Sequence, residues 1–164
     1  MSIPIFHAEK LEYNILYSIF DYLDKVAEQT QKVRFPAFIG LGSCAAVCLV
    51  TRTCSIAEQL INGLSLVFSR DQYDLGKNIL SRVPVQFIES VVLPLGFIVN
   101  TFVIIRDPNF FILNNFEQVK VNVKHAEAGT FGSSEYEREL QNAEGIAKNR
   151  LIERQERNEN THAN

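Results

Sequence analysis

The chain has 164 residues, which is enough for one domain with a hydrophobic core and too few for two large domains. Hydrophobic residues make up 46% and charged residues 21%, which excludes a wholly disordered chain and an ordinary protein of many membrane spans. The net charge is −3 and the sequence contains no long basic stripe, so a nucleic-acid partner has no electrostatic support.

The charges are distributed unevenly along the chain. Residues 1–34 carry nine charges, residues 35–113 carry ten over more than twice that length, and residues 117–159 carry sixteen. This composition divides the chain into three parts: an N-terminal segment (1–34), an apolar middle (35–113) and a polar C-terminal part (114–164).

The first part predicts an amphipathic helix over about residues 8–33. Its apolar residues recur at helical spacing, and its charged residues occupy the rest of the helical wheel. The apolar positions are Leu11, Ile15, Leu16, Ile19, Phe20, Leu23, Val26 and Ala27. Because the polar side is more acidic than basic, packing against a partner helix is favoured over binding to an anionic membrane surface.

The apolar middle begins with seventeen uncharged residues between Arg34 and Arg52. Pro36 suits a break or the first turn of a helix that can continue to Phe68. Seventeen helical residues cover about 25 Å, slightly less than a hydrocarbon core of about 30 Å. The two flanking arginines can extend toward the headgroups and make up the difference.

A second apolar block follows a predicted polar turn over residues 69–78. Its uncharged part runs for sixteen residues, from Ser90 to Ile105, and Pro108 should end the helix. The two blocks predict a helical hairpin that anchors the chain in a lipid bilayer, with both termini on one side. Lysine and arginine are slightly more frequent near the termini than near the turn, which favours the cytoplasmic side for the termini.

The C-terminal part begins with a segment that fits two structures. Residues 117–124 alternate valine with polar residues and fit a short strand, but Phe116, Val119, Val123 and Ala126 also fit a helix. We leave this choice open at the level of the sequence.

Beyond it, Ser133 or Ser134 should cap a charged helix over 134–157, and the tail 158–164 should be disordered. A narrow apolar stripe along this helix predicts a site for a protein partner or for self-association. The stripe consists of Tyr136, Leu140, Ala143, Ala147 and Leu151.

A glycine pattern in the apolar middle raises a different possibility. Gly40, Gly42 and Ala45 fit the phosphate-binding turn of a dinucleotide-binding α/β domain, with Asp71 placed to bind a ribose. Pro36 would interrupt the required strand, and residues 72–164 show no further alternation of strands and helices. A nucleotide-binding α/β domain therefore stays a second alternative.

Other catalytic or metal-binding patterns are not evident. His7, His125 and His162 are far apart in the sequence, and the common hydrolase, phosphate-loop and zinc-protease motifs do not occur. All three cysteines lie in the apolar middle without a nearby histidine or carboxylate to complete a metal site. We expect no enzymatic activity, no metal and no cofactor.

The segment LGKNILSRVPVQFIESVVLPLGFIVNTFVIIRDP resembles uncharacterised membrane-associated proteins of chlamydia-type intracellular bacteria. In hydropathy, the paired apolar blocks of residues 35–113 resemble the bilobed segment of the inclusion membrane proteins of these bacteria. The resemblance contains no functional motif and assigns no site residue. It implies an anchored interaction protein that faces a host or bacterial cytoplasm.

Taken together, these patterns predict an all-α chain with an amphipathic helix, an apolar hairpin and a polar C-terminal helix. The function they favour is a membrane-associated anchoring or interaction protein that binds the bilayer and a protein partner. The first alternative is a soluble helical interaction protein, in which the two apolar helices are buried all round.

Overall fold

The computed structural model describes residues 7–30 and 32–162, and most of these residues are helical. The elements are α1 (His7–Gln29), α2 (Arg34–Val67), the 3-10 helix η1 (Arg70–Gln72), α3 (Tyr73–Leu80), α4 (Val83–Arg106), α5 (Pro108–Ala128) and α6 (Ser134–His162). The predicted all-α class is confirmed for these residues, with an N-terminal amphipathic helix, two long apolar helices and a charged C-terminal helix.

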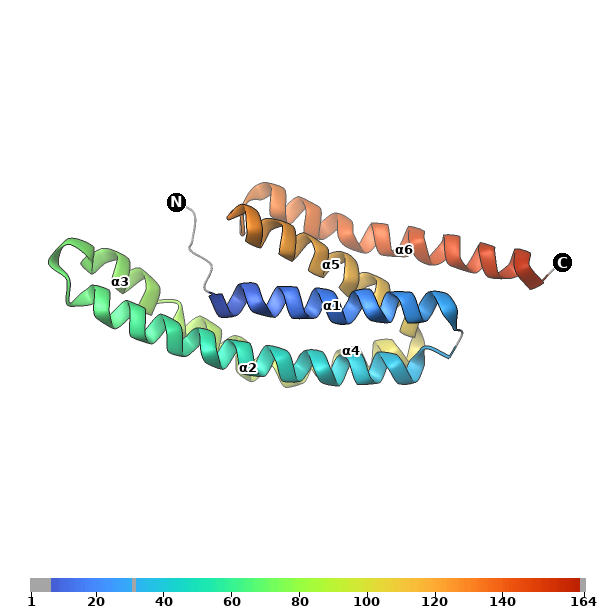
Figure 1. Cartoon of the computed structure of the whole chain (residues 1–164), viewed down its shortest axis with the longest axis horizontal. Helices are drawn as coiled ribbons and strands as arrows, with labels where there is room; N and C mark the ends of the chain where they lie inside the picture. Colours follow the sequence, from blue (N-terminus) through green and yellow to red (C-terminus); the bar gives the residue numbers. More distant parts are fainter. Residues whose placement is uncertain (1–6, 31, 163–164) are drawn as a thin grey trace.

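Four of these helices pack in a square, in which α1 contacts α2, α2 contacts α4, α4 contacts α5 and α5 contacts α1. The short helix α3 packs on the far end of α2, and α6 packs on α5. The molecule has three layers, with α2 and α4 at one side, α1 and α5 in the middle, and α6 at the opposite side (Figure 1).

The hydrophobic core lies between α1, the first half of α2 and α5. The amphipathic pattern of α1 places Leu16, Phe20 and Leu23 in it, as predicted, whereas Leu11 of the same predicted face is 55% exposed. The buried contributions of the other helices to this cluster are Ala37, Leu41 and Cys44 from α2, Ile104 from α4, and Phe111, Ile112, Phe116 and Val119 from α5. The most apolar helix, α4, therefore supplies very little of the core.

Residues 117–124 lie inside α5, so the short strand considered for this segment is wrong. The helix wins because Phe116 and Val119 share one helical face and become buried against α1, whereas an isolated strand has no neighbour to pair with. Helix α5 also crosses residue 113, so the apolar pair itself ends at Arg106.

The predicted polar turn over residues 69–78 is also wrong, because most of this segment is helical, in η1 and α3. Gly76 explains how α3 can pack closely on α2. A Cβ atom on Gly76 would lie 2.7 Å from the Val67 backbone nitrogen and 2.8 Å from the Gly63 carbonyl oxygen. Asp71, Gln72, Asp74, Lys77 and Asn78 stay exposed while this small residue faces α2.

The helix ends follow the sequence predictions more closely. α4 ends at Arg106, before Pro108, and the Asp107 side chain accepts a hydrogen bond from the Phe110 backbone N–H at 2.9 Å. Ser133 caps α6, since its hydroxyl accepts from the Tyr136 N–H at 3.1 Å. The tail differs, because α6 continues to His162 where disorder was predicted, and residues 163–164 lie outside the described residues.

The two glycines Gly76 and Gly42 give a matched test of this packing. Gly76→Ala should lower the free energy of unfolding by about 1–3 kcal/mol, because the new methyl group meets backbone atoms that cannot move aside. Gly42→Ala should raise it by up to about 1 kcal/mol, because that site is open and alanine favours a helix. Urea unfolding in detergent, followed by circular dichroism, measures both. Equal effects of the two changes would contradict the α2–α3 contact.

Candidate membrane-binding face

The outer side of α2 and α4 carries a continuous set of exposed apolar side chains, which we call the outer apolar face. On α2 these are Phe35, Phe38, Ile39, Leu49, Val50, Leu60, Ile61 and Leu64. On α4 they are Val85, Phe87, Val91, Leu95, Ile98, Val99, Phe102 and Ile105, whereas the exposed Ile88, Val92 and Phe97 line the cavity between the four helices. At about 100° per residue, those of α4 span roughly half of the helix circumference.

The inner side of the second half of α2 is polar where the beginning of α1 meets it. Thr51, Ser55 and Gln59 of α2 are 5%, 1% and 0% exposed, respectively. Leu49, Val50, Leu60 and Ile61 lie next to them in sequence and are exposed. This arrangement is the reverse of a water-soluble helix, which buries its apolar side.

Hydrogen bonds join these inward polar residues to α1 and α4, and we call the group the polar cluster. The Thr51 hydroxyl donates to Glu12 Oε2 at 2.5 Å, and Gln86 Nε2 donates to Glu9 Oε1 at 2.5 Å. The Ser55 hydroxyl lies 3.4 Å from Glu9 Oε1 and accepts from Gln59 Nε2 at 3.2 Å. The polar cluster therefore comprises Glu9, Glu12, Thr51, Ser55, Gln59 and Gln86.

The surroundings of the polar cluster are poorly hydrated. Burial raises the pKa of the neighbouring Tyr13 phenol well above its usual value, and the negative charges of Glu12 and Glu9 add to this effect. Gln59 Oε1 and Gln86 Oε1 are buried without a hydrogen-bond partner among the described residues. Polar groups in such surroundings hold helices together because leaving them unpaired is costly.

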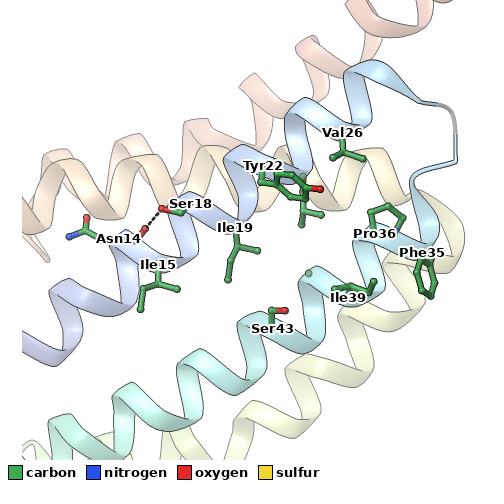
Figure 2. A pocket seen from close by; sticks show the side chains of 12 residues that line it. Asn14, Ile15, Ser18, Ile19, Tyr22, Val26, Phe35, Pro36, Ile39 and Ser43 are labelled. Atoms are coloured by element: carbon green, nitrogen blue, oxygen red, sulfur yellow. Dashed lines mark hydrogen bonds between the residues drawn. The ribbon is translucent and has the colours of Figure 1, made fainter.

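An apolar groove opens between α1 and the beginning of α2, with a volume of about 790 Å³ (Figure 2). Ile15, Ile19 and Val26 of α1 face Phe35 and Ile39 of α2 across it. Its few polar members are Asn14, Ser18, Ser43 and the Tyr22 hydroxyl, and Ser18 already donates to the Asn14 carbonyl oxygen at 3.0 Å. Since Phe35 and Ile39 also belong to the outer apolar face, the groove continues that face toward α1.

A second cavity, of about 600 Å³, lies inside the four-helix square. It combines apolar walls with Glu12, Arg52 and Glu89, and Arg52 Nη1 lies 3.9 Å from Glu89 Oε2. Cys44 and Cys48 line it as free thiols. Within residues 7–30 and 32–162, no group of three histidine, cysteine or carboxylate side chains is arranged to hold a metal ion.

The glycine pattern does not form a phosphate-binding turn. Gly40, Gly42 and Ala45 all lie inside α2, and the segment before them is the first turn of the same helix rather than a strand. Asp71 lies in η1 beyond the other end of α2, and the helix from Gly42 to Val67 alone rises about 38 Å. Gly40 instead allows close packing on α1, since a Cβ atom there would clash with Leu23 Cδ1. The α/β alternative is therefore wrong.

The apolar stripe of α6 has a contact within the chain. Ala143 and Ala147 are fully buried, Leu140 and Leu151 are partly buried, and α6 packs on α5. The Tyr136 ring lies 4.4 Å from the Phe131 ring between centroids, and its hydroxyl donates to Asn122 Oδ1 at 3.1 Å. Whether this stripe also binds another chain stays a prediction.

A group of acidic and arginine side chains fixes the other end of α6. Arg150 reaches Asp24 of α1 at 2.9 Å and Glu117 of α5 at 2.6 Å. Arg154 reaches Asp24 at 2.7 Å and Glu28 at 3.1 Å. We call these five residues the arginine network. It joins α6 to both helices of the middle layer.

Sequence reasoning missed most of the polar cluster. Thr51, Ser55 and Gln59 recur at four-residue intervals, and this spacing in an apolar helix was the available signal. Gln86 and Glu9 gave no such signal, because only the fold brings residues 77 positions apart into contact.

Two helical stretches of the described residues, Arg34–Val67 and Tyr73–Arg106, are long and apolar enough to cross a membrane. Only 28% and 6% of their most apolar windows, respectively, are buried in the fold. No protein-family model matches the chain, and neither a curated protein nor a solved structure is significantly similar to it.

The arginine network predicts a large difference between two neighbouring aspartates. Asp24→Ala should lower the free energy of unfolding by about 2–3 kcal/mol, because it removes the shared partner of Arg150 and Arg154 at a site only 6% exposed. Asp21→Ala removes only an exposed pair with Lys25 and should cost about 0.5 kcal/mol or less. Chemical unfolding of both variants measures the difference, and equal costs would show that the network does not hold α6.

Proposed function

We propose that the chain is a membrane-anchored interaction protein whose outer apolar face contacts lipid. The observation that carries this proposal is the reversed polarity of the second half of α2 and the beginning of α4, in which threonine, serine and glutamine face the protein and large apolar side chains face outward. Lipid is the solvent in which such a surface is stable. The resemblance of this region to membrane-associated proteins of chlamydia-type bacteria implies the same role.

The extent of the face favours lipid over a second copy of the chain. A dimer contact is a patch of limited area and covers one side of a helix. The exposed apolar residues of α4 instead span roughly half of its circumference, and those of α2 continue over its full length. Exposed Arg34 and Arg106 lie at one end of the two helices, and Lys77 lies at the other, where they can reach lipid headgroups.

The opposite layer suits an aqueous compartment and a protein partner. Helix α6 has twelve charged residues and a mixed outer surface on which Ile146 and Ile152 are exposed among glutamate, lysine and arginine. We place this layer on the cytoplasmic side and assign it the interaction role. The anchoring role is proposed without catalysis, since the carboxylates of the polar cluster are engaged with side chains that join α1 to α2 and α4.

A vesicle flotation experiment with a matched control tests the proposal. The unmodified chain, synthesised with phosphatidylcholine–phosphatidylglycerol vesicles, should float with them. Val91→Asp combined with Ile98→Asp should reduce the bound fraction more than about tenfold, because a charge in the hydrocarbon region costs about 2.5–3.5 kcal/mol. Ile152→Asp, an equally exposed apolar residue on α6, should leave flotation unchanged.

Two results would contradict the proposal. Recovery of the unmodified chain as a detergent-free monomer in the soluble fraction would favour the soluble helical protein. A soluble dimer in sedimentation that the Val91→Asp, Ile98→Asp variant breaks would show instead that a second copy covers the outer apolar face.

A further inference from the structure

The length of α2 and α4 permits a membrane-crossing hairpin, but the rest of the fold restricts how they can lie in a bilayer. Helix α1 runs antiparallel along α2. His7 lies beside Glu58, Glu12 beside Thr51, and Leu23 beside Gly40. Over this length, each residue of α1 lies at nearly the same level along the bundle as its neighbour on α2.

Helix α6 is held in the same alignment at two places along its length. Glu139, near its beginning, pairs with Lys124 of α5 at 2.5 Å, and Arg150 and Arg154, near its end, pair with Asp24 of α1. α6 therefore lies alongside α5 and α1, as Figure 1 also shows. If α2 and α4 crossed the bilayer in this fold, the first part of α6, which lies at their level in Figure 1, would cross with them.

Crossing is incompatible with the composition of α6. Its twelve charged residues are distributed over its whole length, and charges in the hydrocarbon core are costly even when they are paired. In this fold the apolar and the charged surfaces lie on opposite sides of the bundle, and not at its two ends. The outer apolar face occupies one side, and α6 occupies the opposite side (Figure 1).

Resting on the proposed function, we infer that the protein lies in the plane of the membrane, with α2 and α4 embedded lengthwise in one leaflet and α6 facing water. An interfacial helix buries its apolar side about 5–10 Å into the boundary of headgroups and acyl chains. In this orientation the outer sides of α2 and α4 contact lipid, while their inner sides contact α1 and α5. Residues at both ends of the bundle then lie in the same aqueous compartment.

Sidedness labelling distinguishes this arrangement from a crossing hairpin. In the full chain with Cys44, Cys48 and Cys54 replaced by alanine, one cysteine is introduced by Asp74→Cys on α3 or by Gln155→Cys on α6. Both positions are exposed, and α3 and the end of α6 lie at opposite ends of the bundle (Figure 1). The chain is synthesised outside sealed phosphatidylcholine–phosphatidylglycerol vesicles, floated, and treated with a membrane-impermeant maleimide before and after detergent.

The in-plane arrangement predicts that both cysteines are labelled fully without detergent and that detergent changes neither. Protection of Asp74→Cys until detergent is added, with Gln155→Cys labelled throughout, would overturn it in favour of a crossing hairpin and leave the proposed function intact. If the protein does not float with the vesicles, the proposed function itself is rejected. A second measurement uses the unmodified chain bound to sealed vesicles. Trypsin added outside the vesicles should cut after Lys77. Protection of that bond would contradict the inference.

Discussion

The hydrogen bonds between the carboxylates of α1 and the polar side chains of α2 and α4 set the orientation of the whole molecule. Glu12 bonds to Thr51 and Glu9 bonds to Gln86, so the polar sides of both apolar helices turn inward. Hydrogen bonds to charged groups contribute about 1.5–3 kcal/mol each, and interhelical bonds in apolar surroundings average somewhat less. Once these polar side chains are inside, their large apolar neighbours in the sequence, such as Val50 and Ile61, lie on the outer surface.

The middle layer reconciles this apolar surface with a charged helix in one fold. α1 and α5 supply most of the core, and each meets a different environment on its two sides. On one side α1 contributes Glu9 and Glu12 to the polar cluster, and on the other it contributes Asp24 to the arginine network. The polarity of the fold therefore changes from apolar to charged across the bundle. Because the change runs perpendicular to the bundle axis, it favours an orientation in which this axis lies in the membrane plane.

Periodicity predicted the helices where apolar spacing was unambiguous. The α1 pattern, the end of α4 before Pro108 and the Ser133 cap were all readable, because each depends on residues within a few positions. Local pattern is insufficient where two periods coincide, as in the valines of α5. It is also insufficient where a polar segment that predicts a turn packs as a helix through Gly76. The polar cluster depends on contacts between residues up to 77 positions apart, which no local pattern contains.

The same limit applies to the apolar stripe of α6. Its spacing identified residues that need a neighbour, and α5 is that neighbour in the fold, but nothing in the stripe itself specified which helix would cover it. The glycine pattern shows the converse. Gly40 and Gly42 match the sequence of a phosphate-binding motif, but in the structure Gly40 packs against α1 and Gly42 is an open position of the helix α2.

The most direct measurement of the central claim compares the surroundings of α4 and α6 in vesicles. Spin labels placed by Ile98→Cys and Ile152→Cys, in the chain with its native cysteines replaced, report collisions with lipid-soluble oxygen and with a water-soluble nickel chelate. Contact of the outer apolar face with lipid predicts that oxygen dominates at position 98 and the nickel chelate dominates at position 152. Dominance of the nickel chelate at both positions would contradict it.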